Sequence, residues 1–333
     1  MFHTSTRVLI YDKGYIAIDD ASKDDAYWNG STMVVGNKKK KTDELVKITL
    51  VNGKSVVCSA NTKFHVMEKR LGGVTLEKAG SLTERHLVYL CDEAPGFDAH
   101  KGSTGKYLSK LSSYEIGMLS AFFERAFEGP KAVEMAKSRK EAHRAFKALL
   151  DTCGVAYTVE EVERRVLRTM YRIDDDAFFE ELKTYRCCNG FPEVFWTSKP
   201  MLEGFLKVLF TFGSFGGEML IVKGQKDSKF LPDVQEALTL FGVNSAFIGG
   251  LMITKLIVSG NNAYNFASRI GIFNAEDLFG PLDYKRFLDY NPKQYSDGRY
   301  ERVSSVKKLI GSGTCMKMGK GDIIVNGMLA QST

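Results

Sequence analysis

Basic side chains recur at corresponding places in two stretches of the chain, each time on or just after a short apolar run that predicts a strand. They are Lys137 and Arg139 in the first stretch, and Lys223 and Lys226 in the second. Cationic side chains arranged along sheet strands can line a charged saddle, and such a surface attracts phosphate groups. The spacing therefore indicates a surface suited to a polyanion.

The cysteines give no sign of metal or disulfide chemistry. All six are scattered, without a C-x-x-C pair, so neither a zinc site nor a disulfide framework is predicted. We expect reduced thiols, as in the cytoplasm or the nucleus. No secretory leader opens the chain and no apolar run is long enough to span a bilayer, which predicts a soluble intracellular protein without a membrane partner.

The overall charge balance is mildly basic. The formal net charge is +6 over 333 residues. This balance permits a nucleic-acid partner and is equally compatible with an ordinary soluble protein. The length allows two domains or one large one, with enough apolar residues for a buried core.

Two copies of one pattern organise the middle of the chain. The better-defined copy, Leu202–Ile248, predicts an apolar helix through Phe212, a Gly-rich turn, a strand, and a second helix that ends at Gly242. Glycine just past a helix is the expected left-handed C-terminal stop. A weaker copy of the same order occupies Ile116–Tyr157. We therefore expect a pseudo-symmetric module over residues 112–273.

Both ends of the chain have strand character. Residues 1–92 and 301–333 contain short apolar runs that are broken by turn dipeptides. Asn52-Gly53 and Asn326-Gly327 are strong signals for two-residue hairpin turns. This pattern indicates one β domain that is built from both ends and interrupted by the helical module.

Three polar segments are predicted to lie outside regular structure. Residues 93–111 and 274–300 have little apolar periodicity and contain Pro, Gly and polar residues, so we expect linkers there. Lys38–Lys41 is a run of four lysines that we expect in a loop. Such a run either contacts phosphate or is simply solvated.

The two apolar helices carry a resemblance to a known family. Leu119–Phe127 (LSAFFERAF) and Leu206–Ser214 (LKVLFTFGS) resemble the nine-residue motif of LAGLIDADG homing endonucleases, and SKFLPDVQEALTLFGVNSAFI downstream is similar to that family too. The resemblance implies two motif helices that pack at a pseudo-twofold axis. It also implies an αββαββα order in which strands saddle double-stranded DNA, within a single-chain monomer.

The flanks resemble a second family, the Hint splicing domain of inteins, which commonly hosts such an endonuclease. Thr6–Val8 resembles the first splicing motif, Val57–Phe64 the second, and Asp322–Ser332 (DIIVNGMLAQS) the intein end. The resemblance implies an α+β chain in which an all-β, horseshoe-like Hint domain is interrupted by the endonuclease module. It also implies a host protein whose extein segments flank the chain.

DNA cleavage in the endonuclease family uses one acidic residue from each motif to hold divalent metal ions, for which Mg²⁺ is suited. The corresponding positions here are Ala126 and Gly213, which cannot bind a metal ion. Glu128 and Glu218 lie further along and are either weak substitutes or surface acids. Val208 stands where the family has a small residue, so we expect a wider separation of the two helices.

Protein splicing needs several groups that this sequence replaces. The departures from the intein pattern are Met1, Thr62, Lys317 and Ala330, which stand where a nucleophile, a histidine, an acid and a second histidine are expected. Gln331 can still cyclise through its side-chain amide, and Ser332 is a plausible next nucleophile. Full splicing is therefore not expected, whereas C-terminal cleavage at Gln331 keeps its nucleophile. His65, three residues after Thr62, either substitutes for the expected histidine or has a structural role, and we expect the structural role.

Three interpretations follow from these residues. In the first, the chain is an intein with an endonuclease module in which both activities have decayed. In the second, the same groups were replaced deliberately to trap an unspliced form. In the third, the chain is a catalytically inactive DNA-binding protein that has kept the saddle of a homing endonuclease.

Overall fold

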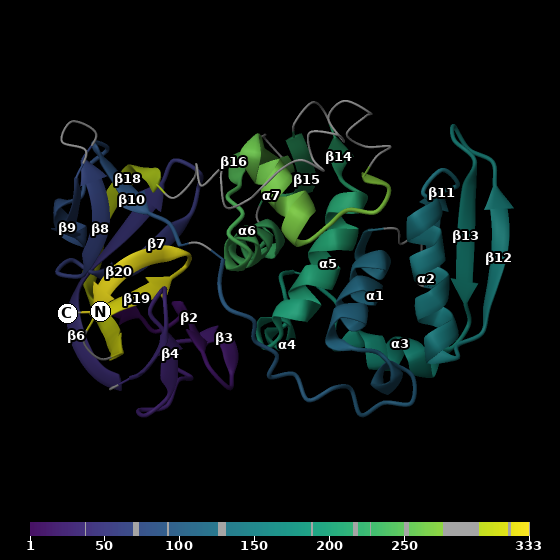
Figure 1. Ribbon diagram of the computed structural model, residues 1–333, viewed down its shortest axis with the longest axis horizontal. Helices are drawn as coiled ribbons and strands as arrows, with labels where there is room; N and C mark the ends of the chain where they lie inside the picture. Colours follow the sequence, from purple (N-terminus) through teal and green to yellow (C-terminus); the bar gives the residue numbers. More distant parts are fainter. Residues whose placement is uncertain are drawn as a thin grey trace. The chain divides into compact units, whose positions relative to one another are not determined.

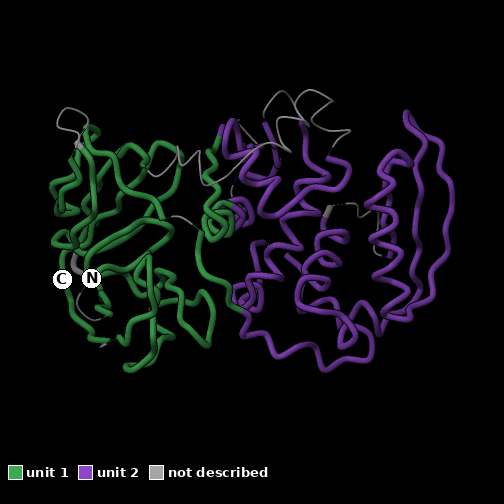
Figure 2. Tube along the Cα trace, in the orientation of Figure 1, with its two compact units in different colours: residues 1–97, 235–247, 293–333 green, residues 98–234, 248–292 purple. Residues whose placement is uncertain are grey.

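The structure is a computed structural model in which two compact units can be distinguished (Figure 2). It describes residues 1–36, 38–68, 73–91, 93–125, 131–187, 189–215, 219–226, 228–249, 253–275, 300–318 and 321–332. Unit 1 comprises Met1–Phe97, Gln235–Phe247 and Lys293–Thr333. Unit 2 comprises Asp98–Val234 and Ile248–Pro292. The chain as a whole is of the α+β type.

Unit 1 is built from strands of both chain ends (Figure 1). Its elements are β1 (Phe2–His3), β2 (Arg7–Ile10), β3 (Gly14–Ala17), β4 (Ala26–Trp28), β5 (Met33–Val35), β6 (Lys38–Leu50), β7 (Ser55–Ser59), β8 (Lys63–Glu68), β9 (Val74–Lys78), the 3₁₀ helix η1 (Ala79–Ser81), β10 (His86–Tyr89), β18 (Tyr300–Met318), β19 (Gly321–Val325) and β20 (Met328–Ser332). The larger sheet has the order β1-β7-β6-β18-β10-β8-β20-β19, with β9 on β8, and the smaller has the order β3-β2-β4-β5.

Both Asn-Gly pairs lie in hairpin loops, but only the second forms the predicted two-residue turn. The β6–β7 loop holds Val51, Asn52 and Gly53 (φ 89°), because the N–H of Leu50 donates to the carbonyl oxygen of Lys54. Asn326 (φ 48°) and Gly327 (φ 74°) alone join β19 to β20. Two successive residues with positive φ are typical of a type I′ turn, whose twist matches that of the strands it connects. The turns fix the register of both hairpins.

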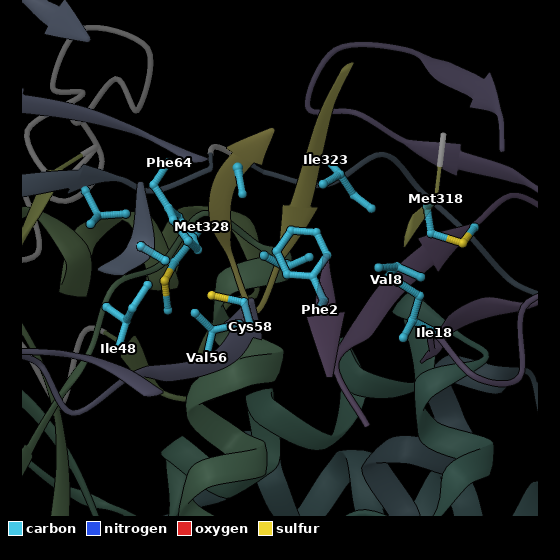
Figure 3. Packing of buried hydrophobic residues seen from close by; sticks show 14 of the residues in the cluster. Phe2, Val8, Ile18, Ile48, Val56, Cys58, Phe64, Met318, Ile323 and Met328 are labelled. Atoms are coloured by element: carbon cyan, nitrogen blue, oxygen red, sulfur yellow. The ribbon is translucent and has the colours of Figure 1, made fainter. Parts of the chain in front are cut away.

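Buried side chains from strands far apart in the sequence form the core of unit 1 (Figure 3). Phe2 from the first strand, Phe64 from β8 and Met328 from the last strand are fully buried in this one cluster. Because apolar burial is the main force that stabilises a fold, the two ends of the chain stabilise each other.

The lysine run Lys38–Lys41 lies in a strand, so the expected loop is wrong. β6 begins at Lys38 and pairs antiparallel with β18 along its length, for example Lys39 with Lys317. The ladder hydrogen bonds and the buried Val46, Ile48 and Leu50 further along β6 hold the lysines in extended conformation. Residue type alone favoured the loop, and the partner strand overrides it.

Unit 2 contains the two-copy module and the segment that leads into it. Its elements are the 3₁₀ helix η2 (Leu108–Lys110), α1 (Ser113–Arg125), β11 (Ala132–Ala136), α2 (Lys140–Cys153), β12 (Tyr157–Val162), β13 (Arg168–Ile173), α3 (Asp176–Lys183), α4 (Glu193–Trp196), α5 (Lys199–Thr211), β14 (Ser214–Phe215), β15 (Met219–Gln225), α6 (Phe230–Leu240), β16 (Ala246–Ile248), β17 (Ile253–Ser259) and α7 (Asn261–Arg269). The boundary between the units passes through α6 and β16.

The same element order occurs twice, as the sequence pattern predicts. In both copies a helix is followed by a strand, a second helix, two strands and a further helix. The sheets correspond as well, because β11-β13-β12 in the first copy matches β15-β17-β16 in the second, where β14 adds an edge strand. Gly154 (φ 70°) and Gly242 (φ 63°) end the second helix of each copy in the left-handed conformation, which confirms the predicted stops.

One face of each sheet is covered by the second helix of its copy. In the first copy the ring of Phe146 on α2 packs against Tyr171 on β13, with ring centroids 5.2 Å apart. In the second copy Leu231 on α6 packs over Gly224 on β15, where a Cβ would lie 2.8 Å from its side chain. No helix among the described residues has the length and apolar character needed to cross a membrane.

Candidate functional site

The helix pair α1 and α5 lies at the centre of unit 2 and positions the two copies (Figure 1). A Cβ on Gly117 would lie 2.0 Å from the carbonyl oxygen of Met201, and a Cβ on Gly204 would lie 2.1 Å from that of Tyr114. Gly117 and Gly204 have the same separation in sequence as Leu119 and Leu206, and so do Tyr114 and Met201. The contacts are therefore reciprocal, as a pseudo-twofold axis between two equivalent helices requires.

The expected wider helix separation is not found at this crossing. The backbones touch at Gly117 and Gly204, about one turn before Val208, and Val208 itself is fully buried. Small residues at a crossing allow backbones to approach closely, and a larger residue one turn away can still be accommodated. The close approach thus depends on glycines that lie outside the nine-residue motif.

Aromatic side chains occupy the C-terminal end of this helix pair. The rings of Phe122 on α1 and Phe212 after α5 pack edge to face with centroids 5.9 Å apart. Phe273 stacks on Phe122 at 6.5 Å, and the ammonium of Lys207 lies 4.7 Å above the ring of Phe273. The ends of the two helices are therefore held together by apolar contacts.

The predicted metal-binding positions are only partly described. Ala126, Glu128 and Glu218 lie outside the described residues. Gly213 follows α5, and a Cβ there would lie 2.6 Å from the carbonyl oxygen of Ile221. An acidic side chain at this position would therefore require the backbone to move. Within the described ranges no cluster of three or more His, Cys, Asp or Glu side chains is arranged to hold a metal ion.

Glu124, an acid within the first motif, has a structural role. Its carboxylate accepts a hydrogen bond from the backbone N–H of Cys187 at 3.0 Å and one from Nε of Arg186 at 3.4 Å. These bonds connect the C-terminal end of α1 to the segment after α3. The Glu124 carboxylate therefore points toward Arg186 and Cys187.

The outer face of the second-copy sheet carries two lysines side by side. Lys223 on β15 pairs with Lys255 on β17, and both are exposed, whereas the neighbouring Val222 and Leu256 are buried beneath the sheet. Lys226 lies just beyond β15 and is exposed. Lys255 was not predicted as a site residue, although it alternates with the apolar Leu256 and Val258, a pattern typical of a strand with Lys255 on the opposite face.

On the outer face of the first-copy sheet, arginines form ion pairs with carboxylates. Glu134 on β11 is buried and lies 3.1 Å from Arg168 and 3.4 Å from Arg164. Arg172 on β13 bonds to Glu160 on β12 at 3.1 Å. This face thus has little net charge.

The two predicted cations of the first copy are also engaged. Lys137 forms an ion pair of 2.5 Å with Glu161, and the guanidinium of Arg139 lies 6.0 Å from the ring centroid of Phe215. Phe215 belongs to β14 of the second copy. The predicted basic residues therefore do not form one continuous surface of free cations.

A cavity of about 570 Å³ lies at the end of the first-copy sheet, lined by Lys131, Ala132, Ala156, Tyr157, Thr158, Arg172, Ile173 and Asp174. Lys131 is held by Asp174 at 2.9 Å and by Asp176 at 3.0 Å. Lys131 and Arg172, the two cations that line the cavity, both form ion pairs with carboxylates. The cavity therefore does not indicate a reactive site.

A second candidate site lies in unit 1, where the first strand meets the second splicing-like motif. The Met1 amine donates to Oγ1 of Thr62 at 2.8 Å, and the Thr62 hydroxyl donates to the Met1 carbonyl oxygen at 2.7 Å. The backbone N–H of Ser59 donates to the same carbonyl oxygen at 2.9 Å. Thr62 thus binds both polar groups of the first residue, at the position where the intein pattern has a histidine.

The electrostatic surroundings of this amine are set by burial and by strands that meet there. Burial lowers the pKa of the Met1 amine. A hydrogen bond of 2.7 Å from the Ser59 hydroxyl lowers the pKa of Asp43, an acid on β6 that was not among the predicted site residues. Burial raises the pKa of the Cys58 thiol to about 12, so this thiol is not a ready nucleophile.

The last strand runs beside this site. Ala330 pairs with Phe64 and Gln331 with Lys63, the residue after Thr62, so both ends of the described chain lie close together (Figure 1). Gln331 also pairs with Asp322 on β19. The side chain of Ser332 lies outside the described residues.

His65 provides the only histidine contact around the last strand within the described part of unit 1. Its Nε2 lies 2.8 Å from Oδ1 of Asp322, and both side chains are partly exposed. The strand register therefore brings a histidine and a carboxylate next to Gln331. The resemblance to the splicing motifs did not predict this pair. It forms because β8 and β19 lie on either side of β20.

No protein-family model matches the sequence, and no curated protein sequence matches it. Several solved structures are similar in part. Full-length DUF199/WhiA from Thermatoga maritima aligns with 15% identity and a TM-score of 0.39, over 54% of this chain and 61% of that chain. The chain thus spans less than two thirds of that protein.

Two further solved structures are similar over smaller parts. The homing endonuclease I-DmoI, solved in complex with DNA and Ca, aligns with 13% identity and a TM-score of 0.39, over 47% of this chain and 89% of that chain. The gp41-1 intein aligns with 23% identity and a TM-score of 0.22, over 27% of this chain and 66% of that chain. Structural neighbours thus include LAGLIDADG proteins and an intein.

Proposed function

We propose that the chain is a duplex-DNA-binding protein of intein and LAGLIDADG homing-endonuclease ancestry, in which DNA cleavage and protein splicing are impaired. In this proposal residues 1–92 and 301–333 are the two halves of a Hint-type domain, and 112–273 are the DNA-binding module. The segments 93–111 and 274–300 connect them. The protein acts as a monomer inside the cell, in the cytoplasm or the nucleus.

The reciprocal contact of Gly117 and Gly204 carries this proposal. Two equivalent helices that touch at equivalent glycines place the two sheets symmetrically about an axis, which is the arrangement that lets a pair of sheets follow a duplex. Sequence resemblance at Leu119–Phe127 and Leu206–Ser214 supports the same ancestry.

The charge distribution supports contact through the second copy above all. Lys223, Lys226 and Lys255 are exposed on or beside one sheet. Arg164, Arg168 and Arg172 of the first copy form ion pairs with carboxylates. Cations that neutralise phosphates release counterions, so their contribution to binding depends steeply on salt. We therefore place most of the backbone contacts on the second copy.

Loss of cleavage is supported by the groups at the helix ends. The packed rings of Phe122 and Phe212 and the crowded position of Gly213 leave no acid from the second motif at the axis. Without metal-bound oxygens to stabilise the attacking and leaving groups, phosphodiester hydrolysis loses its main source of rate enhancement. If an acidic site did form, Mg²⁺ would be the suitable ion.

The experiment is a titration of a fluorescently labelled duplex library with the full chain at several salt concentrations, read by anisotropy. The triple variant K223Q/K226Q/K255Q should weaken binding and reduce the slope of log K against log salt by up to about 3, since each lost phosphate contact contributes about 0.9. K147Q on the exposed side of α2 is a single-charge control and should change neither quantity. Absence of binding at low salt would refute the proposal, and Mg²⁺- or Mn²⁺-dependent nicking of supercoiled DNA would refute the loss of cleavage.

A second candidate activity, cleavage after Gln331, is favoured by the His65–Asp322 pair beside this residue. The side-chain amide nitrogen of Gln331 would attack its own backbone carbonyl and form a six-membered imide. The bond to Ser332 would break, and the departing amine would take a proton that a neighbouring acid such as protonated His65 can supply.

Intact mass measurement tests this cleavage directly. After long incubation a fraction of the full chain should lose Ser332 and Thr333 together, and Q331A should stay intact. H65A should slow the loss without abolishing it. A wild-type mass that never changes would remove this activity.

A further inference from the structure

Several lysines of unit 1 gather on one face of the paired strands β6 and β18. In the second half of β6, Val46, Ile48 and Leu50 point into the larger core. Side chains of a strand alternate between its two faces, so the odd-numbered residues of β6 lie on the other face, where Leu45 is buried with Met1 and Cys315 in a small apolar cluster. The lysines on this other face of the two strands are Lys39, Lys41, Lys47, Lys307 and Lys317, and we call them the lysine face.

Two pairs of these lysines stand directly opposite each other. Lys39 pairs with Lys317, and Lys47 pairs with Lys307. Side chains of directly paired residues in an antiparallel sheet are about 5 Å apart at Cβ, and like charges at this distance repel each other. A protein under selection for stability alone has no reason to place two such pairs on one ribbon. An anion bound between each pair would remove the repulsion.

None of the five lysines forms a hydrogen bond or an ion pair within the part of the chain that the structure describes. The charge of Lys41 nevertheless acts on Asp43, whose pKa it helps to lower. Asp43, the one acid among them on β6, is hydrogen-bonded to Ser59. The contrast is on the opposite face, where Lys308 forms an ion pair of 3.2 Å with Glu44.

We propose that the lysine face binds the phosphate backbone of a nucleic-acid duplex, as a second contact surface separate from the sheets of unit 2. The eight-residue distance from Lys39 to Lys47 corresponds to about 27 Å of strand, and a duplex presents phosphates continuously over this length. The two opposed pairs at either end each receive a phosphate, and Lys41 lies between them.

An exposed apolar side chain accompanies the basic residues. The β6–β18 register shifts between Lys308 and Ser312, and in this irregularity Ile310 is fully exposed. Basic ribbons that bind duplexes combine phosphate contacts with apolar side chains that touch or enter a groove. Ile310 is placed to make such a contact from the same ribbon.

The test compares duplex binding by the full chain in two sets of variants. K39Q/K47Q/K307Q/K317Q should weaken binding and reduce the slope of log K against log salt by about 3 to 4, at roughly 0.9 per lost phosphate contact. The control K13Q/K23Q/K63Q/K78Q removes four lysines from other strands and loops of unit 1 and should reduce the slope by less than 1. I310S should weaken binding without changing the slope, because it removes an apolar contact and no charge.

Each outcome bears on the proposal in one direction. The proposal is wrong if the lysine-face variant and its control have the same duplex affinity and the same salt dependence. It is also wrong if the variant binds anionic vesicles more weakly but binds the duplex as the wild type does. Combination with K223Q/K226Q/K255Q separates the two surfaces. If only the unit 2 variant reduces the slope of log K against log salt, the lysine face does not bind DNA and the proposed function stands. If only the lysine-face variant reduces this slope, the proposed contacts of unit 2 are wrong and the lysine face binds DNA.

Discussion

At the scale of single residues, the proposed loss of both activities depends on side chains at two places. Gly213 has no room for a side chain without a backbone shift, and Phe122 and Phe212 pack together near the ends of the two helices. Thr62 holds both polar groups of Met1. In our proposal, both places are positions where the fold is kept without the catalytic groups.

A buried lysine makes a testable contribution to stability. Lys54 follows the β6–β7 turn, and its Nζ forms no hydrogen bond within the described residues. Burial lowers its pKa from 10.5 to about 8, an effect that Glu301, Glu236 and Cys91 partly oppose. A cation buried in this way destabilises the folded state whenever it is protonated.

We therefore predict that Lys54→Met stabilises the protein in a pH-dependent manner. Below about pH 8 the lysine is protonated in both states, so its burial penalty is fully present and K54M should raise the free energy of unfolding by about 3 kcal/mol. Between pH 8 and 10.5 the unfolded chain binds more protons, so the stability of the wild type rises and the difference shrinks. Urea denaturation between pH 6 and 10 measures it, with the exposed K47M as the control. A difference that does not change with pH would contradict the prediction.

At the scale of elements, the helix pair α1 and α5 determines how the two copies are joined. The sequence places both helices correctly, yet it draws attention to Val208 within the nine-residue motif. The backbone contact occurs at Gly117 and Gly204 instead. A glycine in a helix sequence does not by itself predict which backbone packs against it, because many helical glycines have no close neighbour. The contact is identified only when the position of the neighbouring helix is known.

We predict that Gly204→Ala destabilises unit 2 by about 2 kcal/mol, a typical cost of overpacking. Alanine favours helix formation over glycine, so any loss of stability must come from the contact with the Tyr114 carbonyl oxygen. Urea denaturation followed by Trp196 fluorescence measures the effect. Lys147→Ala, at an exposed position of α2, should be nearly neutral, and a stabilising G204A would show that the helices are further apart.

At the scale of the whole molecule, each unit contains one of the two tryptophans. Trp28 lies on β4 of unit 1 and Trp196 on α4 of unit 2, and both are buried. Each unit also has its own sheets and buried side chains. The fluorescence of each tryptophan therefore reports the folding of one unit.

We predict that single substitutions act on the unit that contains them. In the background W28F, G204A should lower the urea midpoint that Trp196 reports by more than it lowers the midpoint that Trp28 reports in W196F. K54M should shift mainly the Trp28 transition. Equal shifts at both tryptophans would instead mean that the chain unfolds in one cooperative step.

The sequence by itself determined the local elements and their repetition. Asn52-Gly53 and Asn326-Gly327 favour hairpins, Gly154 and Gly242 end helices, and apolar periodicity separates helices from strands, since each of these depends on a residue and its near neighbours. The same local reasoning identified Lys223 and missed Lys255, because the two lysines meet only through the pairing of β15 and β17.

Only the tertiary structure decided what stands opposite each of these residues. The register of β6 against β18 placed Lys39 opposite Lys317 in a strand, where the residue types had indicated a loop. The closure of the first and last strands around β8 brought Thr62, His65 and Asp322 to the two ends of the described chain. Pairings between residues far apart in sequence depend on how all elements pack together, and no local pattern encodes them.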